Sequence, residues 1–344
     1  MITPENLTAL LGPIPRVMLC QTPSALEPWS RLAQHWCPGS RLFAKRDDLV
    51  GPGMGGNKSR QLEFILGAAL AQGADTIIHG GAIQSNYCRQ LSSAAALLGL
   101  ECHLVLSTAY GQPANQGSHL LSRLFGARIT TTELPLGSEH EQIKLRLRDQ
   151  LRAQGRNPYL ITYPQSEILG SLGYVSAAAE LVGQFPGGEP PDVLVTAAVG
   201  ASYAGLLLGL RLMGQSIPVI GIAPLRGEYD VVNAVREAIT EASALLDVNR
   251  PRAIDADIDI RYTQVGDGYA LATPAGLSAL NDCARLQGVL LDPVYTAKAC
   301  AAVRDLLQPG KTLVFLHTGG APAVFAYGEA LVGSMGEAVL AAKP

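Results

Sequence analysis

Gly51-Pro-Gly-Met-Gly-Gly-Asn-Lys-Ser-Arg60 is a glycine-dense turn that leads directly into an apolar helical segment. Glycine permits the tight backbone conformations and close approaches that such a turn needs. The turn can therefore hold the amine of Lys58 against a molecule bound in a cleft, whereas most helical lysines are only solvated charges. The strand-like run Thr76-Ile-Ile-His79 follows this helix, and both belong to one compact unit of alternating strands and helices.

Two chemistries place glycines before a lysine. A phosphate-binding P-loop has the pattern G-x-x-x-x-G-K-[ST]. Gly51 and Gly56 have that spacing, but Asn57 intervenes before Lys58. One inserted residue rotates the lysine by about 100° on an α-helix, so we exclude a P-loop. The other chemistry is a Schiff base with a carbonyl cofactor, usually pyridoxal phosphate, whose phosphate would need a separate binding site.

Beyond the turn, short β-branched runs alternate with longer helical patterns. This alternation predicts an α/β protein with parallel sheets, whose ligands sit beyond the carboxyl ends of the strands. The expected strands are 76–79, 103–106, 129–132 and 159–162 in one compact unit, and 193–199, 219–222, a short strand near 262, and 312–317 in a second. The expected helices follow Lys58 and cover 91–98, 120–125, 139–154, 173–182, 202–213, 229–245, 274–287 and 294–307, with a surface connection at 247–259.

Composition narrows the class of protein. The 344 residues predict two domains, and the formal net charge of -3 does not suggest a nucleic-acid partner. The N-terminus lacks a secretory pattern and there is no long uninterrupted apolar run, so we expect a cytoplasmic protein without a membrane partner. The six cysteines and six histidines lack metal-binding spacings; we expect reduced thiols and no metal site.

Two strand-to-helix turns offer anion sites. In 80–90, Ser85 and Asn86 stand at a helix start, where they either bind a carboxylate or phosphate or simply cap the helix. In 199–205, small residues and Ser202 allow backbone amides to approach an anion, although the full G-x-G-x-x-G spacing is missing. The second turn would serve as the separate phosphate site.

Two later segments carry further polar groups. In 291–298, an aspartate before proline starts a helix and places Tyr295 in its first turn. In 315–320, a strand ends in Thr318 followed by two glycines that permit close approach of a ligand. Each segment alone is typical of ordinary structure, and their order along the chain is what distinguishes them.

Together, the motifs G-G-N-K-x-R, G-x-I-Q-S-N-x-x-R-Q, D-P-V-Y-T-x-K-A and H-T-G-G resemble the pyridoxal-phosphate enzymes of the D-cysteine desulfhydrase and 1-aminocyclopropane-1-carboxylate deaminase family, from about Leu42 to Tyr327. The resemblance implies fold type II (tryptophan synthase β-like), with the cofactor between two open twisted α/β domains. It also implies a homodimer. The expected large domain is 1–55 with 171–344, and the expected inserted small domain is 56–170.

The resemblance also assigns residue roles. Lys58 would hold the cofactor covalently and move protons after the substrate has replaced it. Ser85, Asn86 and the amide of Tyr87 would bind the carboxylate of a small amino-acid substrate, and Asn86 would also touch the cofactor's phenolic oxygen.

The remaining roles follow in the same way. Tyr269 and Tyr295 would face the substrate, which completes a catalytic set of Lys58, Ser85, Tyr269 and Tyr295. Thr318 would lie against the pyridine nitrogen. The phosphate would be bound by Val199, Gly200, Ala201 and Ser202.

The residue after Tyr295 favours one reaction. Family members that open the cyclopropane ring carry a glutamate there, which can share a proton with the pyridine nitrogen, and this chain has Thr296. A neutral hydroxyl stabilises a pyridinium less well than a carboxylate does. We therefore expect β-elimination of the D-cysteine desulfhydrase type, giving pyruvate, ammonia and sulfide.

Three alternatives stay open. The first is a deaminase that opens the cyclopropane ring despite Thr296. The second is a family member that acts on another amino acid from a specialised pathway. The third is a non-catalytic module that keeps the fold. Val199, Ala201, Tyr87 and Tyr203 depart from the residues usual in desulfhydrases, and these changes affect the expected shape of the pocket.

Overall fold

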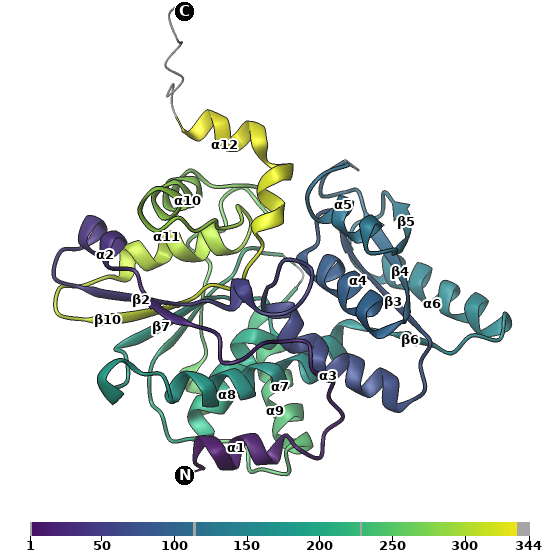
Figure 1. Ribbon diagram of the computed structural model, residues 1–344, viewed down its shortest axis with the longest axis horizontal. Helices are drawn as coiled ribbons and strands as arrows, with labels where there is room; N and C mark the ends of the chain where they lie inside the picture. The colour runs from purple at the N-terminus through teal and green to yellow at the C-terminus, as the bar shows by residue number, and fades with distance from the viewer. Residues whose placement is uncertain (1, 113–114, 228, 336–344) are drawn as a thin grey trace, which may run out of the picture.

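The computed structural model describes residues 2–112, 115–227 and 229–335. These residues form two separate sheets, a six-stranded sheet on the left of Figure 1 and a four-stranded sheet on the right. Every pairing in both sheets is parallel except that of the first two strands. The predicted α/β class with open parallel sheets is confirmed.

The larger sheet has its most apolar strands in the middle. The order is β1 (Leu26–Pro28), β2 (Arg41–Lys45), β10 (Thr312–Leu316), β7 (Val193–Ala197), β8 (Val219–Ile222) and β9 (Asp259–Arg261), with β1 antiparallel to β2. All residues of β8 and β10 are buried. Continuous apolar runs are expected of parallel strands that are covered on both faces.

The smaller sheet is entirely parallel. Its order is β5 (Arg128–Thr132), β4 (Glu101–Ser107), β3 (Thr76–Ala82) and β6 (Pro158–Leu160). All of β3 is buried, whereas β5 forms an exposed, threonine-rich edge. The buried strand β3 therefore lies inside this sheet, and the turn after β3 faces the larger sheet.

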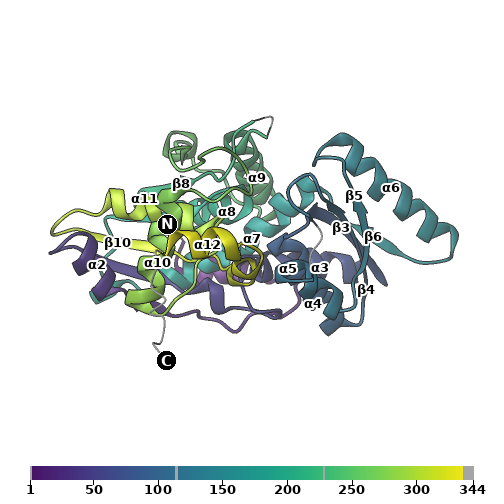
Figure 2. The same ribbon diagram turned by 90° about the horizontal axis from the view of Figure 1, so that it is seen from above.

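Helices cover both faces of each sheet (Figures 1 and 2). One face of the larger sheet packs against α2 (Ser30–Trp36), α10 (Pro274–Gln287) and α11 (Thr296–Leu306), and the other against α1 (Pro4–Leu10), α7 (Tyr163–Val182), α8 (Ala201–Leu212) and α9 (Val231–Leu245). The smaller sheet lies between α6 (Ser138–Ala153) and a layer of α3 (Asn57–Ala71), α4 (Asn86–Leu98) and α5 (Gly117–Leu124). The last helix is α12 (Gly328–Ser334), and short 3₁₀ segments are η1 (Asp47–Leu49), η2 (Pro186–Gly188), η3 (Ile254–Asp257) and η4 (Ala321–Ala326).

Glycines bring α8 unusually close to α7. A Cβ at Gly205 would overlap the backbone oxygen of Ser171, and one at Gly209 would lie 2.6 Å from the Cβ of Ala178. The two helices therefore touch along their backbones, as small residues at a helix contact allow. This contact places the beginning of α8 beside the first turns of α7.

The expected strands occur within a few residues of their predicted bounds, but some helices differ. The helix expected from residue 173 begins instead at Tyr163, where Pro164 occupies the first turn, a position that tolerates proline. The expected surface connection 247–259 contains η3 and ends where β9 begins. α7 runs without interruption across residues 170 and 171, and the domain limits given above stay a prediction.

None of the described helices combines the length and the apolar character required to cross a lipid bilayer.

Candidate active site

The turn before Lys58 is held in a conformation that glycine permits. Positive φ angles occur at Gly51, Gly53, Met54, Gly55 and Gly56. A Cβ at position 55 would overlap the backbone oxygen of Asp48, and one at Gly56 would lie 2.6 Å from Gln90 Nε2. The backbone therefore packs directly against its neighbours, and α3 begins at a fixed point.

Lys58 lies in the first turn of α3 and lines a cavity between the two sheets. Its ammonium nitrogen is 5.8 Å from the centroid of the Tyr87 ring. Burial lowers the pKa of Lys58, and the carboxylate of Glu167 acts in the opposite direction. A lowered pKa increases the fraction of neutral amine, which is the form that attacks a carbonyl group.

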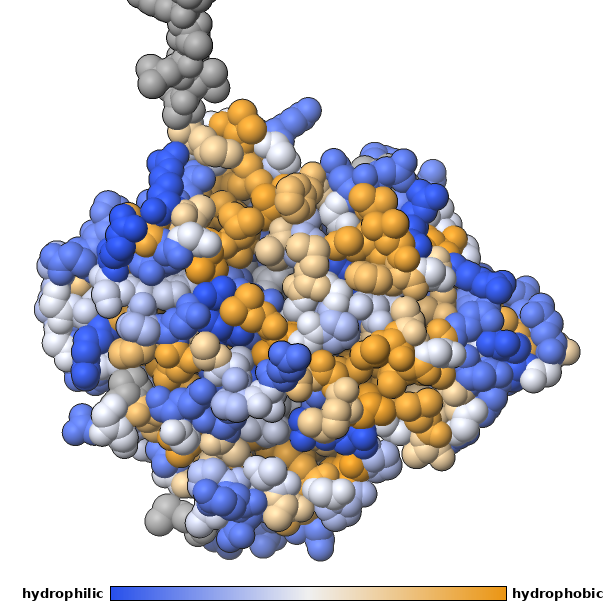
Figure 3. Space-filling view, viewed as in Figure 1, coloured by the Kyte–Doolittle hydropathy of each residue, from blue (hydrophilic) through white to orange (hydrophobic). Residues whose placement is uncertain are grey.

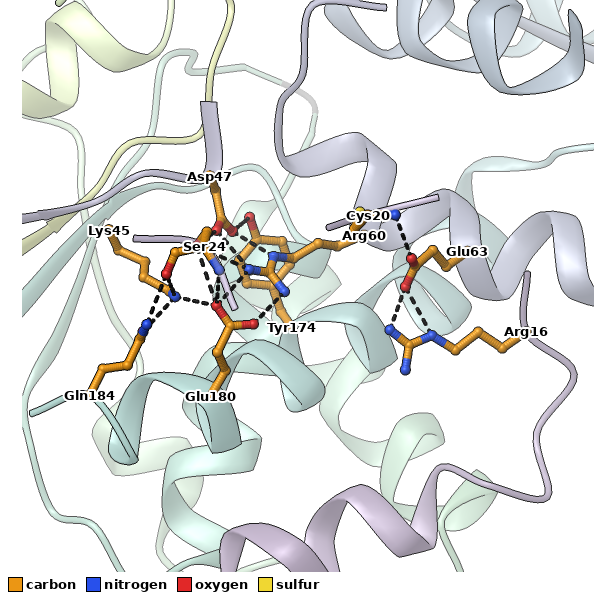
Figure 4. Close-up of polar contacts among 10 residues, drawn as sticks. All are labelled: Arg16, Cys20, Ser24, Lys45, Asp47, Arg60, Glu63, Tyr174, Glu180 and Gln184. Carbon is orange, nitrogen blue, oxygen red and sulfur yellow. Dashed lines mark hydrogen bonds and ion pairs between the residues drawn. The ribbon is translucent and has the colours of Figure 1, made fainter. Parts of the chain in front are cut away.

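Two residues beyond Lys58, Arg60 anchors α3 in a buried ionic network (Figure 4). Its guanidinium donates to both oxygens of Asp47 at 2.9 Å, and to Glu180 on α7 at 3.0 and 3.1 Å. Lys45 pairs with the same Glu180, and the hydroxyl of Tyr174 donates to Asp47 at 2.7 Å. The network ties together β2, η1, α3 and α7.

The charges in this network depend on one another. Burial alone would raise the pKa of Asp47, but Arg60, Lys45 and the Ser24 hydroxyl together outweigh it, and the pKa of Asp47 is lowered. The same pairing raises the pKa of Arg60 despite its burial. Both groups are charged, and loss of either one would leave its partner buried without its closest opposite charge.

The loop 199–202 leads from β7 into α8. The hydroxyl oxygen of Ser202 accepts from Asn57 Nδ2 and from Gln61 Nε2, both at 2.9 Å. Because a hydroxyl oxygen has two lone pairs, both are used, and the hydroxyl hydrogen stays available to an acceptor. The amides of the first turn of α8 have no partner within the helix, which makes this turn suitable for an anion.

Tyr203 and Tyr87, two large residues near these loops, point in different directions relative to the cavity. Tyr203 points away from the cavity, because its hydroxyl donates to the backbone oxygen of Val219 at 2.8 Å. Tyr87 lines the cavity, and its ring is 4.4 Å from that of His79. The buried hydroxyl of Tyr87 has no hydrogen-bond partner. Of the two tyrosines noted in the sequence, only Tyr87 lines the cavity.

Ser85 ends the turn after β3 and caps α4. Its hydroxyl accepts from the amide of Cys88 at 3.1 Å. The capping interpretation of the sequence is therefore correct for Ser85, and Ser85 and Asn86 also line the cavity. The amides of Asn86 and Tyr87 belong to the first turn of α4 and lack partners within the helix.

Tyr269 and Tyr295 form a pair on the opposite wall. Their hydroxyl oxygens are 2.5 Å apart, and the Tyr110 ring lies edge-on to Tyr269 at 5.4 Å. Burial raises the pKa of Tyr269 to about 12, so both hydroxyls are neutral near neutral pH. One hydroxyl donates to the other, and the accepting hydroxyl can direct its own hydrogen elsewhere.

The hydroxyl of Thr296 does not line the cavity. It donates to Asp292 Oδ1 at 2.8 Å and accepts from the Asp292 amide at 2.7 Å. Asp292 in turn caps α11, because its carboxylate accepts from the amides of residues 294, 295 and 296. Thr296 therefore acts locally, and the carboxyl group that lines this wall belongs to Asp292.

Thr318 also lines the cavity, next to a close backbone contact. Its carbonyl accepts from the amide of Asn57 at 2.9 Å, and a Cβ at Gly319 would lie 2.8 Å from the Cα of Gly56. The end of β10 and the beginning of α3 touch through their main chains. This contact brings the two glycine turns of the sequence together.

All of the predicted site residues line this one cavity: Lys58, Ser85, Asn86, Tyr87, Val199, Gly200, Ala201, Ser202, Tyr269, Tyr295 and Thr318. The lining residues that were not predicted include His79, Glu167 and Asp292. Asp292 had a signal, because an aspartate before proline is typical of a helix cap. Glu167 lies within a helix and had none.

His79 is neutral. Burial lowers its pKa to about 3, and its Nδ1 is 3.1 Å from the backbone oxygen of Ile161. Because a carbonyl only accepts, Nδ1 carries the hydrogen. His79 thus supports the Tyr87 ring without adding charge to the cavity.

Comparison with known proteins agrees with this geometry. Residues 17–319 match the family model described as "Pyridoxal-phosphate dependent enzyme". The chain is 37% identical over 336 residues to a D-cysteine desulfhydrase of Klebsiella pneumoniae, covering 94% of this chain and 98% of that protein. It is also 37% identical over 326 residues to one of Salmonella paratyphi A, covering 91% and 96%.

Two solved structures share the fold. A crystal structure of an "ACC deaminase homologue" superposes with a TM-score of 0.86 at 32% identity, covering 95% of this chain and 98% of that one. An L-serine ammonia-lyase from the fungus Rhizomucor miehei gives a TM-score of 0.64 at 17% identity, covering 93% and 99%. The second likeness concerns the fold alone.

The cavity residues fit pyridoxal phosphate. The group needs an amine for its aldehyde and donors for its phosphate. Lys58 supplies a buried amine with a lowered pKa. Ser202 supplies a hydroxyl hydrogen that its two protein contacts leave available, beside the first turn of α8.

We predict that Arg60→Met lowers the free energy of unfolding by about 3–5 kcal/mol, because it removes the ion-pair partner of the fully buried Asp47 and leaves Glu180 paired with Lys45 alone. Lys311→Met is the control, since its pair with Asp192 is exposed and should contribute less than about 1 kcal/mol. Urea unfolding followed by circular dichroism measures both. Equal, small losses in the two variants would show that the network does not anchor α3.

Proposed function

The chain belongs to the family of pyridoxal-phosphate-dependent enzymes, and we propose that it is a lyase that carries out β-elimination on a small amino acid, with D-cysteine as the substrate. The overall reaction would convert D-cysteine and water to pyruvate, ammonia and hydrogen sulfide. The D-cysteine desulfhydrases at 37% identity support this proposal.

The state of Thr296 is the observation that favours elimination over ring opening. Its hydroxyl is engaged with Asp292 as both donor and acceptor. At this position the chain thus offers the cavity neither a carboxylate nor a free hydroxyl. Elimination needs less electron withdrawal than ring opening, because the departing thiol carries the electrons away.

Lys58 would bind the cofactor, which, when bound, withdraws electrons from the substrate's α-carbon. Once the substrate has replaced Lys58 on the cofactor, the free Lys58 amine would take the proton from the α-carbon of the substrate. Its lowered pKa suits this role, because a general base must be largely unprotonated near the working pH.

The beginning of α4 would hold the substrate carboxylate. The first-turn amides of Asn86 and Tyr87 and the hydroxyl of Ser85 converge at the cavity wall. Helix N-termini favour anions through free amides and through the helix dipole. This contact would fix the α-carbon relative to Lys58.

The Tyr269–Tyr295 pair would contact the side-chain end of the substrate. Because only one of the two hydroxyl hydrogens can lie between oxygens 2.5 Å apart, the other is free to donate to the leaving sulfur. We propose these two residues as the catalytic groups on the large-domain wall. Thr318, on the same side, would lie against the ring nitrogen of the cofactor.

We also propose that the enzyme is a homodimer. Large hydrophobic side chains are exposed around the turn before α3, on α4 and α5, and in η4: Leu49, Met54, Leu97, Leu124 and Phe325 are 59–69% exposed. Figure 3 shows hydrophobic residues spread across this face. Exposed apolar surface of this kind is typical of an interface, and a second copy of the chain is its simplest occupant.

Light scattering of the purified protein tests the dimer. We expect a mass twice the chain mass of 36.2 kDa, and a shift toward the single-chain mass in Leu124→Glu. Glu241→Gln, on the exposed face of α9, serves as a control and should leave the mass unchanged. A wild-type mass equal to that of one chain would contradict the proposal.

Incubation with D-cysteine tests the reaction. We expect equal amounts of sulfide and pyruvate, measured colorimetrically and with lactate dehydrogenase. A parallel incubation with 1-aminocyclopropane-1-carboxylate should give no 2-oxobutyrate. Release of 2-oxobutyrate would favour the deaminase instead, and a screen of D- and L-amino acids for keto-acid release would follow if neither substrate reacts.

Lys58→Ala separates an enzyme from a binding module. We expect the visible absorbance of protein-bound cofactor to disappear and product formation to fall by at least about a thousandfold, because the variant lacks both covalent attachment and the base. Lys311→Ala should retain both. A catalytically unaffected Lys58→Ala variant would rule out the role given to this lysine.

A further inference from the structure

Glu167 is a carboxylate inside the cavity that neither the motifs nor the proposed reaction uses. It lies on the first turns of α7, and its Oε2 accepts a hydrogen bond from the amide of Ala201, the first residue of α8. A Cβ at Gly200 would overlap the same oxygen. The carboxylate is therefore seated closely at the beginning of α8, and glycine at position 200 leaves room for it.

The surroundings of Glu167 contain one positive charge. Lys58 faces it from α3, while Tyr87 from α4, Tyr163 from its own helix and Tyr229 before α9 interact with it electrostatically. Burial and the Glu167 charge raise the pKa of each of these tyrosines, which keeps them neutral. Among the described residues, Lys58 and the amide of Ala201 at the helix N-terminus are thus the groups that stabilise the carboxylate.

The phosphate of the cofactor is expected at the same place. The two hydrogen bonds that the Ser202 oxygen accepts leave its hydroxyl hydrogen available, and Ala201 and Ser202 begin the helix whose amides would bind the phosphate. A carboxylate and a phosphate dianion a few ångströms apart repel each other strongly even at the intermediate effective dielectric of a protein site. The two anions cannot share the site at low cost.

We propose that Glu167 is an internal occupant of the phosphate site: its carboxylate holds the N-terminus of α8 until the cofactor phosphate arrives, and loading requires Glu167 to move away or take up a proton. This inference rests on the phosphate site of the proposed function. It makes Glu167 a determinant of cofactor affinity and of its pH dependence.

The direction of the pH effect follows from linkage. Burial raises the pKa of Glu167, with Lys58 and the Ala201 amide acting in the opposite direction. A bound phosphate raises that pKa further, so binding takes up a proton at pH values between the free and bound pKa of Glu167. By reciprocity, phosphate affinity falls as the pH rises through that range.

The test uses pyridoxine 5′-phosphate and pyridoxine, which lack the aldehyde and cannot bond covalently to Lys58. Binding to wild type, Glu167→Gln and the exposed control Glu241→Gln is measured by isothermal titration at a lower and a higher pH, about 6 and about 8.5. The phosphate of the free ligand titrates at about pH 6, and this contribution is the same in all three experiments. Glutamine keeps the shape of the side chain and can still accept from Ala201. Thermal unfolding checks that each variant is folded, and Glu167→Ala is the second variant.

We expect Glu167→Gln to bind pyridoxine 5′-phosphate at least about tenfold more tightly at the higher pH, with a smaller gain at the lower pH. Its affinity for pyridoxine should equal that of wild type. Unchanged or weaker binding of the phosphate compound, or an equal gain for pyridoxine, would overturn the inference. Product formation from D-cysteine by the wild type is measured separately, so this failure would leave the proposed function standing.

Discussion

The position of Arg60 is the constraint on which the site depends. Its guanidinium lies between the buried carboxylates of Asp47 and Glu180, so α3 cannot rotate or slide without separating opposite charges in the interior. With Arg60 fixed on one side of the helix, Lys58 and Gln61 project from the other, toward the cavity and toward Ser202. One ionic network thus orients both the amine and a support of the phosphate loop.

The cavity is built from helix beginnings. α3, α4, α8 and α11 all begin at its wall, as expected where two parallel sheets direct the carboxyl ends of their strands toward each other. Ser85 caps α4 and Asp292 caps α11, each from within a few residues of the helix. Glu167 caps α8 from a position 34 residues away in the sequence.

That difference explains which residues could be predicted from the sequence. Local signals in the sequence mark the sheet strands, the glycine turns and the residues at strand-to-helix turns. The structure brings all of the predicted site residues to the walls of one cavity. Glu167 and His79 have no such signal, because their place in the cavity depends on packing between distant elements. The true start of α7 was missed for a related reason, since its first turns line the cavity and lack an apolar period.

The main-chain contact between Gly319 and Gly56 sets a limit on how this molecule can diversify. Because backbone meets backbone there, a side chain at position 319 cannot be accommodated unless the end of β10 and the beginning of α3 move apart. This contact therefore fixes the distance between the end of β10 and the beginning of α3, the helix that carries Lys58. Any adaptation to a longer or bulkier substrate must therefore be made elsewhere in the lining, at side chains such as those of Leu136, Tyr163 and Tyr87.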